Sequence, residues 1–226
     1  MPKPLMQNAT NTRNKHRRGF PAFSLVELLA VIAIMALLIA VAVPVFTDPA
    51  NSARQASREI IKGQLQRARA HAIASGSATA IAIPVLATGG DLGVRAISLF
   101  EVVKNGAVYE PVKDASGVEK QLQRWETLPG NFHFLPASLI SSPKPTILDA
   151  AETLQTNHNG KVVTCHLIVF APNGQIVLPT SETNIIIARA TNSGSSLSLT
   201  QKTNGQPVFE LLQVNRLTGR TRTIQP

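Results

Sequence analysis

The stretch from Leu28 to Phe46 consists of 19 consecutive apolar residues, with Pro44 near its end. As an α-helix it would be about 28 Å long, which is close to the hydrocarbon thickness of a lipid bilayer. A core helix of a soluble domain would instead show polar residues at helical spacing. The sequence therefore predicts a membrane-spanning helix over residues 23–46.

Much of the positive charge lies at the N-terminus. The formal net charge is +9, and no acidic residue occurs before residue 20, where five basic residues lie: Lys3, Arg13, Lys15, Arg17 and Arg18. Such a basic flank keeps its end of a spanning helix in the cytoplasm. We therefore expect a single-pass protein with a cytoplasmic N-terminus and an extracytoplasmic head, and not a general polyanion-binding protein.

Two residues are unusual for a plain membrane anchor. Glu27 lies at the cytoplasmic edge of the apolar stretch, where an unpaired carboxylate is costly. It either reaches back to the lipid headgroups or pairs with a cation. Pro44 removes a backbone donor, so it should loosen or kink the helix near its outer end.

The run Phe23-Ser24-Leu25-Val26-Glu27-Leu28-Leu29 follows the basic leader and begins the apolar span. In spacing, residue types and flanks it resembles the class III signal of type IV pilins and type II secretion pseudopilins. The resemblance implies cleavage by a prepilin peptidase between Ala22 and Phe23, N-methylation of Phe23, and roles in assembly for Glu27 and Pro44. It also implies that Glu27 pairs with the N-terminal amine of a neighbouring subunit, which would offset the desolvation of both charges.

Two other cleavage sites compete with this one. Ala22 lies where the family usually has glycine, and the Gly19-Phe20 pair just upstream could be taken for the site. Cleavage there would make Glu27 the eighth residue instead of the fifth, so we predict cleavage after Ala22. The second alternative is an ordinary signal peptide, since Ala40-Val41-Ala42 fits signal peptidase and would release a soluble binding module beginning at Val43.

A second helical pattern follows a short interruption. We expect an amphipathic helix over residues 47–76, because apolar residues recur at steps of three to five: Ala53, Ala56, Ile60, Leu65, Ala68 and Ala72. Arg54, Arg58 and Lys62 repeat every four residues and should form a cationic face, which is solvated by default and otherwise contacts lipid phosphates, a partner subunit or DNA. Ser75-Gly76 ends the helix, since glycine adopts the left-handed conformation without steric cost.

Residues 77–226 show strand periodicity and are expected to form a β-rich head. The predicted strands include Ile97–Val103, Lys161–Phe170, Gln175–Leu178, Asn184–Ala190, Ser195–Thr200 and Pro207–Val214, separated by Gly- and Asn-rich turns. These features predict an α+β fold: a long N-terminal helix, with a transmembrane and an amphipathic part, packed on two antiparallel sheets. Residues 135–159 show little periodicity and predict a long loop that could contain a short helical segment.

Three short segments narrow the resemblance. Residues 65–73, Phe170-Ala171-Pro172-Asn173-Gly174 and residues 214–222 resemble the H-type minor pseudopilins (GspH-like) and the related FimT pilins. The resemblance implies a pilin-like structural subunit of the inner membrane, with its head in the periplasm. Its expected partners are other pseudopilins or minor pilins, the prepilin peptidase and the inner-membrane assembly platform.

No catalytic constellation is found in the sequence, so we expect no enzymatic activity, no cofactor and no metal. Phosphate-binding glycine loops, G-x-S-x-G and H-E-x-x-H are absent. The single cysteine, Cys165, excludes an intrachain disulfide and a cysteine-rich metal site. Cys165 and His166 are neighbours on one predicted strand, so their side chains point to opposite faces.

The C-terminal run Gly219-Arg220-Thr221-Arg222 is the one motif of the head that suggests a ligand. Arg220 and Arg222 would share a face of a terminal strand, with Arg216 across the turn. The resemblance to FimT pilins implies DNA as a possible partner, through a weak, salt-sensitive contact with phosphates. The alternative is a set of surface arginines that serve solubility or contact a neighbouring subunit.

Overall fold

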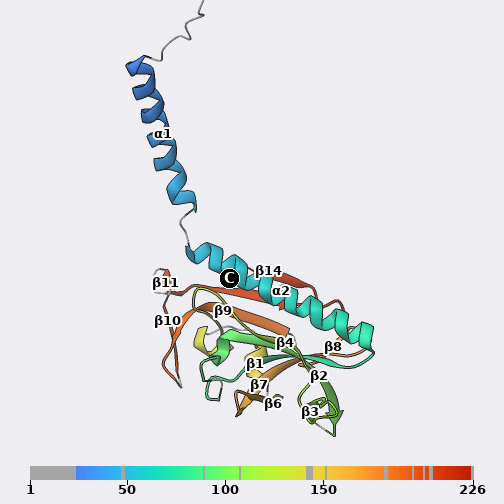
Figure 1. The fold of residues 1–226 in the computed structure, drawn as a ribbon. Helices are drawn as coiled ribbons and strands as arrows, with labels where there is room; N and C mark the ends of the chain where they lie inside the picture. Colours follow the sequence, from blue (N-terminus) through green and yellow to red (C-terminus); the bar gives the residue numbers. More distant parts are fainter. Residues whose placement is uncertain are drawn as a thin grey trace, which may run out of the picture. The chain divides into compact units, whose positions relative to one another are not determined.

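The structure is a computed structural model that describes residues 24–46, 49–88, 90–106, 108–140, 145–150, 152–180, 183–194, 196–200, 202–203 and 206–224 (Figure 1). The chain divides into two units, Met1–Asp48 and Pro49–Pro226. The predicted cleavage between Ala22 and Phe23 lies outside the described residues. The predicted continuity of one long helix depends on residues 47 and 48, which also lie outside them.

The first unit contains one helix, α1, from Leu25 to Phe46. The helix includes Pro44 and ends two residues after it. The side chains described in α1 are exposed within the isolated chain. Over the residues that the structure describes, the search for a helix both long enough and apolar enough to cross a membrane found none. The membrane span therefore stays a prediction from the sequence.

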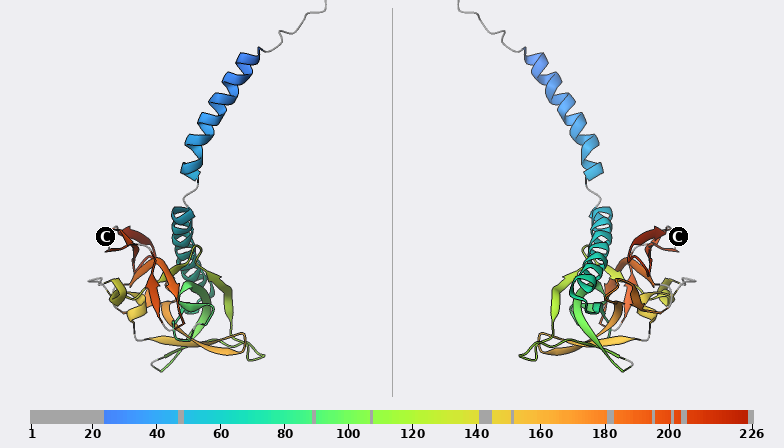
Figure 2. Two further views of the ribbon diagram at one scale, coloured as in Figure 1. Left: turned by 90° about the vertical axis from the view of Figure 1, so that its left-hand side faces the viewer. Right: turned by 90° about the vertical axis from the view of Figure 1, so that its right-hand side faces the viewer.

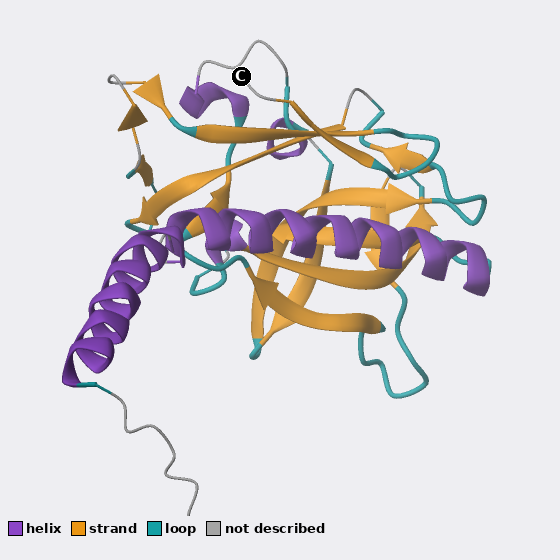
Figure 3. Ribbon diagram, turned by 90° about the horizontal axis from the view of Figure 1, so that it is seen from above, coloured by secondary structure: helices purple, strands orange, loops and turns teal. Residues whose placement is uncertain are grey.

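The second unit begins with α2, from Pro49 to Ser75, which lies across the strands of the head (Figure 3). Its fully buried residues follow one helical stripe: Ser57, Ile61, Leu65, Ala68 and Ala72. Ala56, which the sequence placed on the apolar face, is exposed. The helix ends as predicted, because Gly76 has a φ of +67° and its N–H donates to the Ala72 carbonyl at 3.1 Å.

In the described part of the chain, the larger sheet has seven antiparallel strands. Its order is β3-β2-β1-β7-β6, with β4 also paired to β2 and β8 to β7. These strands are β1 (Thr79–Pro84), β2 (Ala96–Asn105), β3 (Val108–Pro111), β4 (Gln121–Thr127), β6 (Thr153–His158), β7 (Lys161–Phe170) and β8 (Ile176–Leu178). The central strand β1 is buried along its whole length and pairs with β2 and β7.

The smaller sheet has the order β10-β9-β13-β14, with β5 also paired to β9. These strands are β5 (Phe132–Phe134), β9 (Thr183–Asn192), β10 (Leu197–Leu199), β13 (Phe209–Val214) and β14 (Thr221–Ile224). A two-stranded ribbon joins β11 (Lys202–Thr203) to β12 (Gln206–Pro207). Among its described residues the unit also contains three short 3-10 helices, Gly93–Arg95, Ala137–Ile140 and Ile147–Asp149.

The main core lies where α2 meets both sheets. Ile61 and Leu65 from α2 join Ile81 and Phe170 from the larger sheet and Ile187 from the smaller one, all with no exposed surface. A second cluster around Phe100 and Cys165 covers the opposite face of the larger sheet. The expectation of an α+β fold with two antiparallel sheets is confirmed for the second unit.

The prediction of a long loop over residues 135–159 missed a strand, whereas the short helical segment that it allowed for is present. This segment contains two of the 3-10 helices and the strand β6. In β6 only alternate residues are buried, and of these Leu154 is apolar and Thr156 polar. A short edge strand of this composition gives too weak a period-2 signal to be recognised from sequence.

Candidate functional site

The first turn of α1 is held by a pair of side chain–backbone hydrogen bonds. Ser24 Oγ accepts from the Val26 N–H at 3.3 Å, and Glu27 Oε2 accepts from the Ser24 N–H at 3.1 Å. This is the arrangement of a capping box, in which two free N–H groups of a helix start gain acceptors. The Glu27 carboxylate is exposed and lies at the helix N-terminus, where the helix dipole favours a negative charge.

A separate candidate site, within the second unit, is the hairpin of β13 and β14. Asn215 Oδ1 accepts from the N–H groups of Leu217 and Thr218, both at 3.0 Å. The Gly219 N–H returns to the Asn215 carbonyl at 2.8 Å, with a φ of +64° at Gly219. The turn is therefore fixed by hydrogen bonds from its own backbone N–H groups to the side chain and carbonyl of Asn215, and the residues that follow begin β14 in a defined register.

Arg216 binds the rest of the head. Its Nη1 donates to the Thr180 carbonyl at 2.6 Å and its Nη2 to the Ile176 carbonyl at 3.3 Å. Its own carbonyl accepts from the Ile176 N–H at 2.8 Å. The guanidinium thus ties the hairpin turn to β8 of the larger sheet, and it is not a free cation.

Arg220 and Arg222 are placed together, as predicted from their spacing. Both are exposed, and Arg222 lies opposite Gln213 of β13. Among the described residues neither side chain has a hydrogen-bond or ion-pair partner. They line a shallow groove of about 520 Å³ with Asn215, Thr218 and Thr221. The three arginines therefore differ: Arg216 holds the turn to β8, whereas the guanidiniums of Arg220 and Arg222 have no partner among the described residues.

Because the Arg216 side chain has hydrogen-bond partners and that of Arg220 has none among the described residues, substitution of the two should change stability by different amounts. Arg216→Ala should lower the free energy of unfolding by about 1 kcal/mol, because its hydrogen bonds to two carbonyls, one exposed and one half-buried, are lost. Arg220→Ala should change it by less than about 0.5 kcal/mol, because an exposed unpaired side chain is removed. Urea unfolding of the three proteins checks this, and a larger loss for Arg220→Ala would contradict the assignment of roles.

The sequence predicts a solvated cationic face on α2, but two of its three basic residues form ion pairs with the smaller sheet. Arg54 Nε lies 3.6 Å and Arg58 Nε 3.4 Å from the carboxylate of Glu210 in β13. The arginine side chains are 26% and 25% exposed and that of Glu210 only 12%. These ion pairs hold the helix to the smaller sheet. Lys62 pairs with Glu59 on the helix itself, at 3.0 Å.

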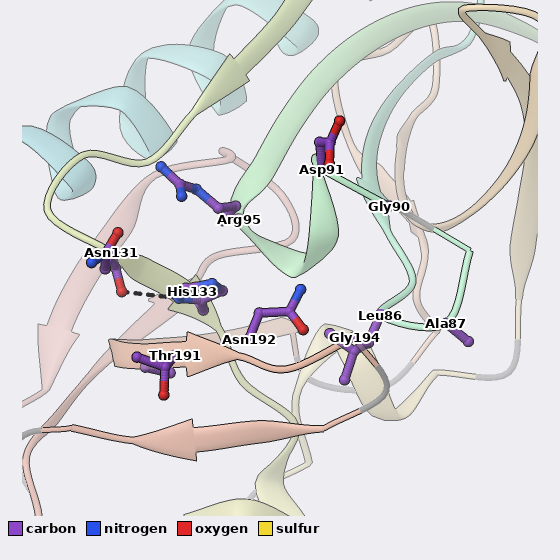
Figure 4. Close-up of a pocket in the computed structure, with 11 residues that line it drawn as sticks. Leu86, Ala87, Gly90, Asp91, Arg95, Asn131, His133, Thr191, Asn192 and Gly194 are labelled. Carbon is purple, nitrogen blue, oxygen red and sulfur yellow. Dashed lines mark hydrogen bonds between the residues drawn. The ribbon is translucent and has the colours of Figure 1, made fainter.

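A cavity of about 740 Å³ in the head shows no catalytic arrangement. Figure 4 shows Arg95, Asn131, His133 and Asn192 among the residues that line it, and the dashed line joins His133 to Asn131. His133 Nδ1 is 2.9 Å from the Asn131 carbonyl. Neither serine nor cysteine lines this cavity, and no metal-binding cluster is found among the described residues.

His133 predicts a pH dependence of stability. Burial lowers the pKa of its imidazole, and the nearby charge of Arg95 acts in the same direction. The folded protein therefore keeps His133 neutral, whereas the unfolded chain takes up a proton below its ordinary pKa of about 6.5. Stability should fall as the pH drops from 7 to 5. In His133→Gln this loss should be smaller, which unfolding curves at several pH values would check.

Cys165 and His166 both lie in β7 and do not form a pair. Cys165 is fully buried, and burial raises the pKa of its thiol to about 12. We predict that a thiol-specific reagent at pH 7 leaves the folded protein unlabelled and labels it fully in urea. Labelling of the folded protein at the rate of the unfolded chain would contradict this placement.

Comparisons with known proteins give one structural likeness. No family model and no curated protein matches the chain. A solved structure, the type IV minor pilin FimU of Pseudomonas aeruginosa, is similar to this chain with a TM-score of 0.41 and 17% identity. The match covers 78% of this chain and 90% of the other. A likeness of this degree assigns neither a family nor a function.

Proposed function

We propose that the protein is a minor subunit of a type IV filament-like machine, of the kind represented by the H-type pseudopilins of type II secretion. The observation that carries this proposal is the start of α1. Glu27 is the only charged residue of this helix, and it lies in a capped first turn. Every residue after it is apolar. A carboxylate at this one position is suited to pair with a cation of another chain.

The proposed role is mechanical. A prepilin peptidase would cut after Ala22, and the apolar helix would hold the subunit in the inner membrane until it joins a filament. The head would then contact neighbouring subunits. The support from the head is that α2 is built into its core through Ile61 and Leu65 and through the ion pairs with Glu210. A force applied to α2 during filament assembly would therefore be transmitted to both sheets.

The N-terminal residue of the purified protein tests this proposal. The full chain is expressed with and without a prepilin peptidase, extracted from membranes and analysed by N-terminal sequencing and intact mass. We expect a chain that begins at N-methylated Phe23 only when the peptidase is present. Gly19→Ala serves as the control, because it removes the competing upstream site and should leave the product unchanged. A product that begins at Val43 would overturn the proposal and indicate a secreted soluble domain.

A second candidate function is DNA binding by a pilus-tip subunit, favoured by the exposure of Arg220 and Arg222 without partners. Two free guanidiniums can neutralise phosphates without regard to base sequence. Duplex DNA should then be retarded in a gel at low salt and released as the salt rises. Arg220→Ala with Arg222→Ala should flatten the logarithmic salt dependence by about two units.

The matched control for this test is Arg124→Ala, which removes another exposed arginine, from β4. It should leave DNA binding nearly unchanged. Absence of binding at low salt, or equal weakening by all three substitutions, would remove DNA binding as a candidate.

A further inference from the structure

The last strand, β14, is an edge of the smaller sheet. It pairs with β13 on one side, and no strand is recorded on its other side in the described part of the chain. Figure 2 shows this strand, in red, at the outer border of the head. An edge strand presents unpaired N–H and C=O groups, and natural proteins either protect such groups or use them for pairing with another chain.

The register shows which backbone groups are free. The Arg220 carbonyl accepts from the Asn215 N–H at 2.8 Å, so the backbone of Arg220 points toward β13. Alternate residues of an antiparallel strand point to opposite sides. The N–H and C=O groups of Thr221 and Thr223 therefore point away from β13. No backbone partner of these groups is recorded among the described residues.

This edge is protected only by its short length and by the charge of Arg222. Within Thr221–Ile224 there is no proline and no acidic residue, and threonine and isoleucine favour extended backbone. By contrast, the edge strand β3 contains Pro111, and on β6 the Asn157 N–H donates to Glu119 Oε2 at 3.2 Å. Of these three edges, β14 is the one without such a block.

The charges beside this edge indicate the partner. Arg220, just before β14, and Arg222, within it, occupy alternate positions of the extended chain, so their side chains lie on one face. An added strand would place its own alternate side chains directly opposite them, where opposite charges stabilise the pair. In this chain no two acidic residues are separated by a single residue. A second copy therefore lacks the complementary pattern.

We propose that β14 accepts an extended strand from a different protein subunit, with carboxylates two residues apart opposite Arg220 and Arg222. This inference rests on the proposed function, because a neighbouring filament subunit would supply the strand. The backbone of Thr221 and Thr223 supplies the hydrogen bonds, and the two arginines select the acidic pattern. Arg216 fixes the hairpin turn that precedes the strand.

The test uses the full chain in detergent micelles and a synthetic nine-residue peptide of alternating Val and Thr with two Glu at positions i and i+2. We expect saturable binding and slower hydrogen exchange at the Thr221 and Thr223 amides. Replacing both Glu by Gln should weaken binding about tenfold, through the loss of two charge pairs. The key variant is Thr223→Pro, which removes an outward N–H without removing a bond to β13. It should weaken binding about tenfold, whereas Thr223→Val, which keeps the N–H, should not.

Two results would overturn this proposal: no binding of the peptide at millimolar concentration, or equal binding by Thr223→Pro and Thr223→Val. The test is independent of the cleavage experiment. A chain that begins at methylated Phe23 but binds no peptide would leave the filament proposal standing and remove only the strand-pairing proposal.

Discussion

Gly130→Ala is expected to lower the free energy of unfolding by about 3 kcal/mol, because two costs add. Gly130 has a φ of +62°, a conformation that residues with a Cβ rarely adopt. It also lies in the turn between β4 and β5 where the backbone meets α2, and a Cβ there would overlap the methyl group of Ala53. Urea unfolding followed by circular dichroism measures the loss.

The matched control is Gly117→Ala. Gly117 has a φ of +79°, but nothing lies within 4 Å of the position that a Cβ would take. Only the backbone strain remains, and we expect a loss of about 1 kcal/mol. The difference between the two variants measures the close approach of the turn to α2. Equal losses would show that α2 moves to accommodate the new methyl group.

Glu27→Gln is expected to abolish incorporation into filaments while α1 keeps its N-terminal cap. Glutamine can still accept the Ser24 N–H in a capping box, but it carries no charge to pair with an amine. Glu27→Ala removes both the acceptor and the charge. If the proposed role depends on the charge of Glu27, Glu27→Gln and Glu27→Ala should be equally defective in filament assembly. The measurement is the amount of subunit in sheared filaments relative to the membrane fraction.

The control for this experiment is Ser24→Ala, which removes the other half of the capping box and keeps the carboxylate. We expect it to assemble at close to the normal level, because loss of a cap costs only about 1 kcal/mol. Normal assembly of Glu27→Gln would show that the carboxylate acts as a helix cap and not as a charge.

Several elements of the second unit could be predicted from sequence because their signals are local. The end of α2 follows from Gly76, whose positive φ has no cost for glycine. β7 and β13 are long or strongly apolar runs bounded by turn residues. The position of Arg220 and Arg222 on one face follows from the period of two in a strand. These features depend on short stretches of chain.

Other features depend on contacts between distant residues, which the sequence does not display. The cationic repeat of α2 looks solvated until Glu210 is placed beside Arg54 and Arg58. Likewise, Arg216 looks equivalent to Arg220 and Arg222 until the carbonyls of Ile176 and Thr180 are placed within its reach. The role of each arginine was therefore fixed by its tertiary partners and not by its motif.

Trp125 gives this molecule a local optical reporter. It is the only tryptophan of the chain, and its ring centroid lies 5.9 Å from that of Phe100 and 6.2 Å from that of His158. All three residues belong to the larger sheet. Tryptophan emission therefore follows the melting of that sheet alone, whereas circular dichroism follows both sheets. Coincident transitions would show that the two sheets unfold as one cooperative unit. Separate transitions would show that the smaller sheet, which contains β14, can unfold independently of the larger one.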